Sequence, residues 1–230
     1  MQIKQVIGTG LVAAAFSVSA LANDLQSMED RVSYMIGMDI GQSLGEQDMD
    51  LNIEVLIDAL RASFKGEELL MTDEEALAVR NEFMQARQAE MEQQRDRDAR
   101  RNLEEGQAFL AQNRERADVV ETESGLQYRV IEAGDGRSPG PSDVVTVHYR
   151  GTLLNGTQFD SSFDRGEPAT FALNQVIPGW TEGVQLMQEG ARFEFFIPAE
   201  LAYGEMGRPG PIGPNSTLIF EVELIEVQGD

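Results

Sequence analysis

The stretch that decides the fold is V-I-P-G-W-T-E-G-V-Q-L-M, residues 176–187, which contains the only tryptophan of the chain, Trp180. Proline is favoured in the first turn of a helix, so Pro178-Gly179 predicts that a helix begins here. A core tryptophan usually lies in the middle of an element, whereas one at the entrance of a helix can form the floor of a pocket. The residues that converge on Trp180 decide between these two interpretations.

Segments that alternate apolar and polar residues surround this helix and predict β-strands. The alternation begins after Asp118, and L-N-G-T at 154–157 is typical of a hairpin turn. The apolar positions that share a face are Leu126, Tyr128 and Val130; Val145, Val147 and Tyr149; Phe193, Phe195 and Ile197; and Leu218, Phe220, Val222 and Leu224. We therefore expect an α+β domain in which an antiparallel β-sheet wraps one short helix.

A helix laid on the sheet would place Trp180 between the two layers, next to several aromatic residues. Those that could surround it are Tyr149 and Phe220 on the strands, Phe159 and Asp160 after the hairpin turn, and Tyr203 in a Gly/Pro-rich loop. An aromatic concavity with one carboxylate and one phenol is typical of a small-ligand site. The same aromatic side chains could instead form an ordinary core, and their spacing alone does not separate the two interpretations.

The motifs of this region strongly resemble those of the FKBP-type peptidyl-prolyl isomerases, from about Gly125 onwards. They are V-x-Y-x-G at 147–151, G-x-x-F-D-S-S at 156–162, V-I-x-G-W-x-E-G at 176–183, L-A-Y-G at 201–204 and T-L-I-F-E-V-E-L at 217–224. The helical extension before them resembles, more loosely, the macrophage infectivity potentiator group, whose members dimerise through N-terminal helices. The resemblance implies a peptidylprolyl isomerase, EC 5.2.1.8, that needs no cofactor and no metal.

The resemblance also implies a prolyl pocket whose floor is Trp180. Catalytic roles would fall to Asp160, Tyr203 and Trp180, and substrate-binding roles to Tyr149, Phe159, Phe171, Val176, Ile177, Ile212 and Phe220. The backbone N–H of Ile177 and the hydroxyl of Tyr203 would donate hydrogen bonds to the carbonyls of a peptide or of a macrolide such as tacrolimus. Asp160 would lie beside the twisted amide, with its charge held by neighbouring hydrogen bonds.

Four positions depart from the family pattern or call for comment. Ala169 stands where many members carry an aromatic residue, which would lower one wall of the pocket and weaken macrolide binding. Met206 and Arg208 lie at the tip of the overhanging loop and would alter substrate preference. His148 alternates away from the face of Tyr149, which favours a structural role over a catalytic one.

The N-terminus is typical of a secretory signal peptide over residues 1–22. Lys4 supplies the positive charge, residues 6–18 the apolar region, and A-L-A at 20–22 a small-x-small cleavage site. The alternative, a transmembrane anchor, is disfavoured because the apolar run is short and interrupted by glycine and serine. We expect export to the periplasm, either free or peripheral to the outer membrane, without a lipid anchor because no cysteine follows the cleavage site.

Residues 24–66 show two amphipathic helical patterns. The first carries Gly37, Gly41 and Gly45 four residues apart, and the second begins at a plausible N-cap, Asn52, and ends before Gly66. Two such helices cannot enclose a core of their own, and we expect them to bury their apolar faces against a second copy of the chain. An ordinary intramolecular helical core is the alternative.

A third helix is expected from the capping box at residues 72–75 to about Arg116. Its middle, residues 85–102, is almost entirely polar, as in a helix that crosses solvent between domains. Disorder of this stretch is the competing interpretation, with Gly106 as a weak point. The predicted domains are a signal peptide at 1–22, a helical dimerisation domain at 23–70, a linker helix at 71–117 and an isomerase domain at 118–230.

Composition excludes several functions. The chain has 40 acidic and 18 basic residues, a net charge of −22 and no cysteine. Such a charge argues against a nucleic-acid partner, because phosphates would be repelled. The expected function is isomerisation of prolyl bonds in unfolded or proline-containing exported polypeptides, with chaperone activity from a homodimer formed through residues 24–70. The alternatives are a non-catalytic holdase chaperone and a degenerate isomerase fold that only binds.

Overall fold

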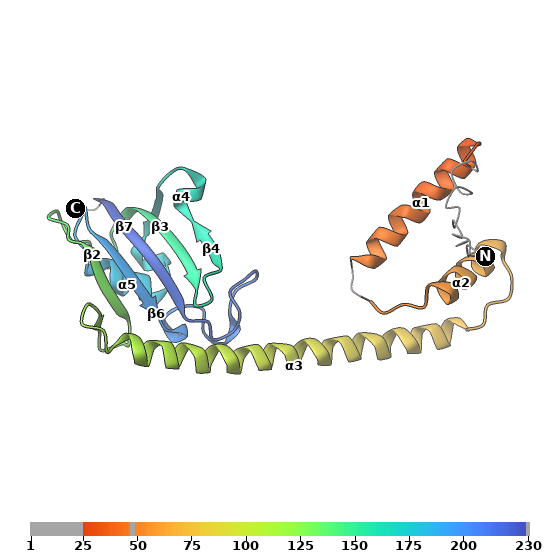
Figure 1. The fold of residues 1–230 in the computed structure, drawn as a ribbon, viewed down its shortest axis with the longest axis horizontal. Coiled ribbons are helices and arrows are strands. Elements are labelled where there is room, and N and C mark those ends of the chain that lie inside the picture. The colour runs from red at the N-terminus through yellow and green to blue at the C-terminus, as the bar shows by residue number, and fades with distance from the viewer. Residues whose placement is uncertain (1–24, 47–48, 229–230) are drawn as a thin grey trace, which may run out of the picture. The chain divides into compact units, whose positions relative to one another are not determined.

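The computed structural model describes residues 25–46 and 49–228 (Figure 1). The signal peptide expected at residues 1–22 lies outside the described residues. Among those described, no helix has the length and apolar character needed to span a bilayer. The chain divides into two compact units, one up to Glu75 and one from Ala76 onwards.

The first unit contains α1 (Met28–Gly45) and α2 (Ile53–Lys65), each defined by its caps. Ser27 and Asp30 form a capping box at the start of α1, and the Asn52 side chain accepts hydrogen bonds from the first turn of α2. Gly66 ends α2 at φ +68°, a left-handed conformation that glycine adopts at little cost. Both caps predicted for α2 are confirmed.

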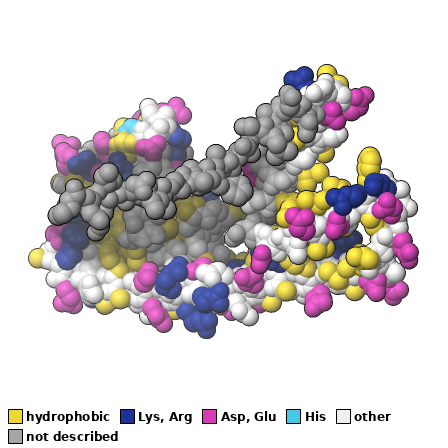
Figure 2. Space-filling view, turned by 45° about the vertical axis from the view of Figure 1, so that its right-hand side comes forward, with side chains coloured by type: hydrophobic (Ala, Val, Ile, Leu, Met, Phe, Trp, Pro, Cys, Tyr) yellow, Lys and Arg dark blue, Asp and Glu magenta, His cyan; other side chains and the backbone are white. Residues whose placement is uncertain are grey.

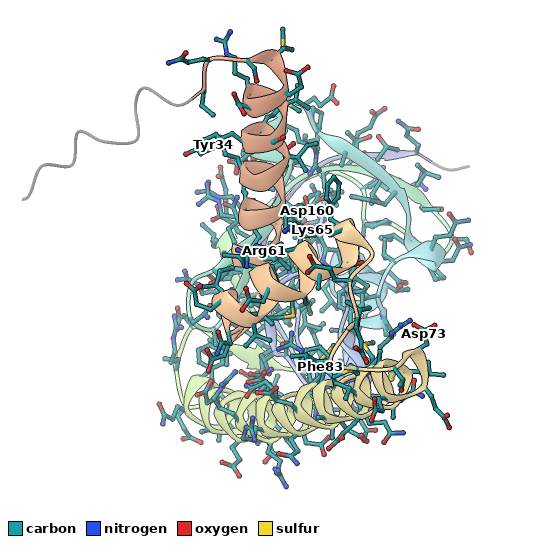
Figure 3. The ribbon with its side chains drawn as sticks, turned by 90° about the vertical axis from the view of Figure 1, so that its right-hand side faces the viewer. Tyr34, Arg61, Lys65, Asp73, Phe83 and Asp160 are labelled. Atoms are coloured by element: carbon teal, nitrogen blue, oxygen red, sulfur yellow. The ribbon has the colours of Figure 1, made fainter. Side chains whose placement is uncertain are left out.

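Neither α1 nor α2 buries a residue within the described chain. Their large apolar side chains are exposed, and Figure 2 shows yellow hydrophobic side chains gathered over these helices. Tyr34 projects from α1, while Arg61 and Lys65 lie on α2 (Figure 3). A Cβ added at Gly37, Gly41 or Gly45 would meet nothing within 4 Å. The alternative interpretation, an ordinary intramolecular helical core, is therefore not observed within the described chain.

The third helix, α3 (Asp73–Asn113), is continuous for 41 residues, about 60 Å at 1.5 Å per residue. Thr72 and Glu75 form its capping box as predicted, and Figure 3 marks Asp73 in its first turn. The alternative interpretation, disorder of the polar residues 85–102, is wrong because these residues are helical. The helix ends three residues before the expected end at Arg116.

The second unit is built on a seven-stranded antiparallel sheet. Its strands are β1 (Val120–Glu121), β2 (Gln127–Glu132), β3 (Val144–Leu153), β4 (Gln158–Ser161), β5 (Ala169–Ala172), β6 (Arg192–Ile197) and β7 (Leu218–Gln228). The order is β1-β2-β6-β7-β3-β4, and β5 pairs with β3 beyond the end of β4. The last strand of the chain therefore lies in the middle of the sheet, and the expected α+β fold is confirmed.

The helix α5 (Pro178–Gln185) packs against one face of this sheet (Figure 1). The side chains that meet it are the alternating apolar residues of β3, β6 and β7, nearly all less than 9% exposed. The face predicted for β2 is confirmed only in part, since Leu126 is buried, Tyr128 is half-buried and Val130 is 50% exposed. The hairpin turn at 154–157 is present, with Gly156 at φ +85°.

The opposite face of the sheet is also partly covered, which the sequence did not suggest. Phe196 is 3% exposed and its ring lies 5.7 Å from that of Phe109 on α3. Gly106, expected to be a weak point, is buried instead, and a Cβ there would lie 2.3 Å from Oγ1 of Thr217. The C-terminal end of α3 is therefore packed against the sheet, so only its earlier turns fit the expectation of a helix surrounded by solvent.

Candidate functional site

The entrance of α5 fixes the position of Trp180. Pro178 occupies the first turn, and the Trp180 N–H donates to the Ile177 carbonyl at 2.9 Å. Gly179 and Gly183, which face Ile197 and Phe195, let the helix approach β6 closely. A Cβ at Gly179 would lie 2.5 Å from the Ile197 side chain, and side chains of any size there would push the helix off the sheet.

Three aromatic rings surround the indole edge to face. The ring centroids of Tyr149, Phe171 and Phe220 lie 5.3, 5.6 and 5.2 Å from that of Trp180. This is the geometry that aromatic quadrupoles favour. Trp180 is only 4% exposed, and its Nε1–H has no hydrogen-bond partner among the described residues. The indole is therefore held by packing rather than by polar contacts.

A cavity of about 420 Å³ opens above the indole. Its lining consists of Tyr149, Asp160, Phe171, Gln175, Val176, Ile177, Trp180, Tyr203, Arg208 and Phe220. This volume falls within the range of small-ligand pockets, about 300–1,000 Å³. Most of the residues expected at the site are thus brought together around one opening, including Phe171, which was expected behind the walls.

Two expected residues do not line the cavity. Phe159 packs edge to face on Phe220, with ring centroids 5.4 Å apart, and a Cβ at Gly151 would collide with both rings. Ile212 is 4% exposed and belongs to the core. Phe159 therefore supports the lining from behind and Ile212 belongs to the core, a distinction that motif matching could not make.

Asp160 is held by two donors. The Tyr149 hydroxyl donates to Oδ2 at 2.6 Å, and Arg165 donates to Oδ1 at 2.5 Å. Burial alone would raise the pKa of the Asp160 carboxyl, but these hydrogen bonds and the charge of Arg165 together lower it below its ordinary value. The carboxyl is therefore ionised at neutral pH, as expected.

Sequence reasoning missed two residues, Gln175, which lines the cavity, and Arg165, which holds Asp160. Arg165 also donates to the Tyr149 hydroxyl at 2.9 Å, and its guanidinium lies 5.4 Å from the centre of the Tyr149 ring. Burial, followed by the hydrogen bond to Asp160, raises the pKa of the Tyr149 phenol. Arg165 is the last residue of α4 (Ser162–Arg165), a single helical turn. A helix this short leaves no periodic signal in the sequence. The signal available was the position of Arg165 five residues after Asp160.

Tyr203 and Arg208 enter the cavity from the loop that precedes β7. Arg208 donates to the Tyr203 hydroxyl at 3.4 Å, and its guanidinium lies 5.7 Å from the centre of the Tyr203 ring. Met206, at the tip of the same loop, is 75% exposed and does not line the cavity. Of the two departures at this tip, only Arg208 is therefore placed to act on a ligand.

The remaining departures lie away from the opening. The His148 ring stacks on Phe163 at 4.7 Å, and its Nδ1 lies 3.0 Å from the Ser162 hydroxyl. This position, on the face opposite Tyr149, confirms the expected orientation. Ala169, on β5, pairs with Val147 of β3 and also lies outside the lining. No cluster of three or more His, Asp or Glu side chains suited to a metal ion occurs in the described part of the chain.

Comparisons with known proteins point to one family. The profile described as "FKBP-type peptidyl-prolyl cis-trans isomerase" matches residues 135–225, and "Domain amino terminal to FKBP-type peptidyl-prolyl isomerase" matches residues 29–130. The Outer membrane protein MIP of Legionella longbeachae is 42% identical over 227 residues, 97% of each chain. The probable FKBP-type isomerase FkpA of Neisseria meningitidis is 46% identical over 87% of this chain and 75% of its own length.

Among solved structures, the crystal structure of FkpA from Escherichia coli aligns with a TM-score of 0.74 and 34% identity. The alignment covers 88% of this chain and 98% of that chain. The likeness therefore extends over the N-terminal helices as well as the sheet.

Proposed function

The chain belongs to the FKBP-type peptidyl-prolyl cis-trans isomerases, and from this premise we propose that the cavity above Trp180 is its prolyl pocket. The observation that supports this most is the indole, which lies at the bottom of an opening with aromatic rings on three sides. A proline ring is apolar and compact, and burying it against such a surface is favourable.

Catalysis would work by differential binding. Rotation about the X-Pro bond meets a barrier of about 18–20 kcal/mol that arises from amide resonance. A dry aromatic pocket withdraws the hydrogen bonds of water that stabilise the planar, charge-separated amide. A pocket that fits the twisted amide better than either planar form lowers the barrier, and no covalent intermediate is required. A thousandfold to millionfold acceleration corresponds to about 4–8 kcal/mol.

Two polar groups would orient the substrate. The Ile177 backbone N–H, at the entrance of α5, and the Tyr203 hydroxyl, on the loop, are proposed to donate to substrate carbonyls. The Asp160 carboxylate, fixed by Tyr149 and Arg165, would face the twisted amide from the side. Once a bound substrate displaces water from the pocket, such fixed charges act more strongly than in bulk solvent.

The test is the cis–trans isomerisation of a short Leu-Pro peptide, with and without tacrolimus. We expect acceleration that tacrolimus abolishes, and at least a tenfold loss in Asp160→Ala and Trp180→Leu, roughly the loss of 1.4 kcal/mol of transition-state stabilisation. His148→Gln is the matched control, since His148 belongs to the same motif but lies outside the lining. Unchanged turnover in both pocket variants would show that the pocket is assigned wrongly.

The apolar surface of the helical unit supports a second proposal, a homodimer with chaperone activity. The exposed side chains on α1 and α2 include Met28, Met35, Ile36, Met38, Ile53, Val55, Leu60 and Phe64, the last 91% exposed. A surface of this kind marks an interaction site. A second copy would cover most of it, and the tethering of two pockets would raise their joint affinity for an unfolded chain.

The two activities can be separated by experiment. Suppression of aggregation of an unfolded protein should survive Asp160→Ala and be lost when Leu60 and Phe64 are replaced by serine. If aggregation is suppressed but no peptide is isomerised, the chain is a holdase that uses the isomerase fold for binding alone.

Export to the periplasm is proposed from the predicted signal peptide, in agreement with the outer-membrane name of the Legionella relative. Sequencing the N-terminus of the protein recovered from the cell envelope should give Asn23 as its first residue. A cytoplasmic protein that retains its N-terminal methionine would contradict this.

A further inference from the structure

The charged groups that line the pocket are not balanced in the same way. They are the carboxylate of Asp160 and the guanidinium of Arg208. Asp160 is neutralised by its ion pair with Arg165. Arg208, by contrast, forms no ion pair with a carboxylate in the described ranges. Its side chain makes a hydrogen bond and a cation–π contact, both with Tyr203. The pocket mouth therefore carries one uncompensated positive charge.

The backbone around Arg208 is fixed by its own loop. The Arg208 N–H donates to the Ile212 carbonyl at 2.8 Å, and the Asn215 N–H donates to the Gly204 carbonyl at 2.9 Å. Gly207, at φ +64°, lets the two sides of the loop cross closely, because a Cβ there would lie 2.6 Å from the backbone of Gly213. The loop that carries Arg208 is thus closed by two backbone hydrogen bonds, which fix the position of the Arg208 backbone.

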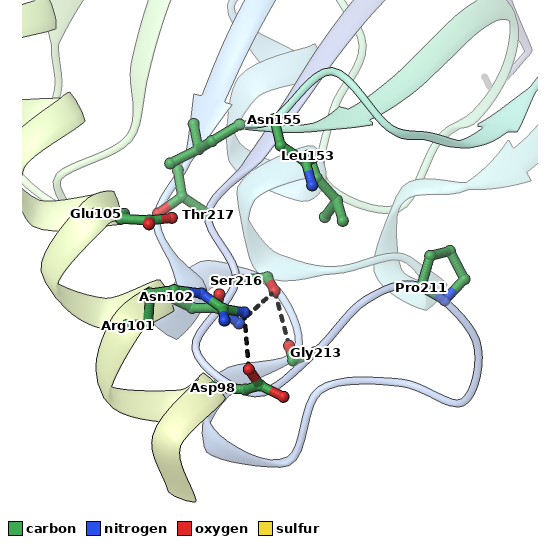
Figure 4. Close-up of a pocket in the computed structure, with 11 residues that line it drawn as sticks. Asp98, Arg101, Asn102, Glu105, Leu153, Asn155, Pro211, Gly213, Ser216 and Thr217 are labelled. Carbon is green, nitrogen blue, oxygen red and sulfur yellow. Dashed lines mark hydrogen bonds and ion pairs between the residues drawn. The ribbon is translucent and has the colours of Figure 1, made fainter. Parts of the chain in front are cut away.

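The helix α3 braces this loop from behind. The Asn102 side chain donates to the Pro214 carbonyl at 2.8 Å, and the Asn215 side chain donates to the Ala99 carbonyl at 3.3 Å. Figure 4 shows Asn102 beside Ser216, to whose hydroxyl its amide also donates at 3.4 Å, among the residues that line a cavity of about 340 Å³. Because the base of the loop is tied to α3, its tip is held beside Tyr203.

The sign of this charge is opposite to that of the chain, whose net charge is −22. The field of the chain repels acidic peptides at long range, and Arg208 attracts them at the pocket. We infer that Arg208 forms a subsite that favours an acidic side chain in a residue flanking the substrate proline. This inference rests on the proposed prolyl pocket and adds a substrate class to it: prolyl peptides with Asp or Glu next to the proline.

Matched peptide pairs test the subsite. Turnover is compared for Glu-Pro against Gln-Pro and for Pro-Glu against Pro-Gln, since Glu and Gln share a shape and differ in charge. The guanidinium is exposed to solvent, so we expect kcat/KM of the full-length protein to favour the acidic member of at least one pair by about two- to tenfold. The preference should shrink in about 1 M salt, where the Debye length is about 3 Å.

Three variants separate the charge of Arg208 from other effects. Arg208→Gln should reduce the ratio to one or below, because only the repulsion by the chain remains. Arg208→Lys should keep it above one. Arg150→Gln removes the same charge from the same domain, at a guanidinium that lies over the Phe163 ring outside the pocket lining, and should keep the wild-type ratio. A general loss of activity cancels, because each ratio compares two peptides with one protein.

A wild-type ratio of one or below for both pairs, or the wild-type ratio in Arg208→Gln, would overturn the subsite. Failure of the proposed pocket gives a different result, because Leu-Pro, Gln-Pro and Glu-Pro peptides would then all isomerise at their uncatalysed rates with tacrolimus without effect.

Discussion

The helices α1 and α2 of the first unit are exposed, whereas the shorter helix α5 of the second unit is half buried. The 18 residues of α1 and the 13 of α2 begin at side-chain caps and bury nothing in the described chain. The eight residues of α5 have no side-chain cap at their start and bury four of their number. Capping determines where a helix begins, whereas burial depends on whether the chain also supplies a surface to pack against.

The two units differ in whether their apolar faces are covered within the described chain. The sheet unit buries about twenty apolar side chains, most of them in the core cluster that includes Trp180 and Val184 of α5. The helical unit has the amphipathic pattern without the second layer. Substitutions in the two units should therefore have different consequences.

Matched leucine truncations give the sharpest contrast. Leu224 is fully buried on β7, so Leu224→Ala should lower the free energy of unfolding of the sheet unit by about 2–5 kcal/mol. Leu60 on α2 is 56% exposed, so Leu60→Ala should leave that unfolding midpoint unchanged and weaken dimerisation instead. Trp180 fluorescence in urea reports the sheet unit alone, and light scattering reports the dimer. Equal shifts of the midpoint in both variants would mean that the two units unfold as one.

The contact between α3 and the sheet should be sensitive to a single methyl group. Gly106→Ala would place a Cβ 2.3 Å from Oγ1 of Thr217, and overpacking of this kind costs about 1–3 kcal/mol, against about 1 kcal/mol gained from helix propensity. Thr217→Ala removes the obstructing oxygen, so the double variant should be more stable than the sum of the single changes predicts. Simple additivity in a urea double-mutant cycle would show that the helix is not seated at Thr217.

The caps of the helical unit should matter only locally. Asn52→Ala removes the acceptor for the N–H groups of Glu54 and Val55 and should cost about 0.5–2 kcal/mol of α2 stability. Faster amide hydrogen exchange in α2 would report the loss, while turnover of a short prolyl peptide should stay at the wild-type rate. Asn52→Asp, which keeps the acceptor, should restore the protection. A loss of peptide turnover in Asn52→Ala would show that the units are coupled.

The pair of Asp160 and Arg165 should give the smallest change in stability, because their side chains are 39% and 45% exposed and such pairs are screened by water. The pKa of Asp160 is lowered in the folded state, so its contribution to stability is present above the ordinary pKa of a carboxyl and is lost as pH falls through the folded value. Arg165→Gln should raise the pKa of Asp160, as seen by NMR titration of the carboxyl. The stability difference from wild type should be present at neutral pH and vanish well below about pH 4. A difference that persists in acid would point to packing rather than charge.

Sequence reasoning went furthest where one local period determines the structure. The buried faces of β6 and β7 and the start and end of α2 follow directly from residue alternation, an N-cap and a C-terminal glycine. Tyr149 and Phe220 could be grouped around Trp180 from strand alternation and a helix laid on the sheet, whereas Phe171 was added by the family resemblance.

Long-range contacts carried no such local signal. The contact of Phe196 with Phe109, the seat of Gly106 on Thr217 and the capture of Asp160 by Arg165 each join segments whose meeting depends on the finished fold. The short elements β1, β5 and α4, of two to four residues, exist because longer neighbours pair with them or cap them. Separating the residues that line the pocket from those that support it likewise required the three-dimensional arrangement.

The place of β7 in the sheet has a consequence for how the protein is made. β7 joins β6 to β3, and its register with β3 pairs residues about seventy positions apart, such as Tyr149 with Val222. It is also the last of the strands to be synthesised. Until it leaves the ribosome, β1, β2 and β6 share no strand pairing with β3, β4 and β5, and the contacts that connect the two halves are non-local and slow to form. A nascent chain would therefore lack its complete sheet until translation is nearly finished, and a polypeptide without a finished sheet can still be threaded through a translocation channel.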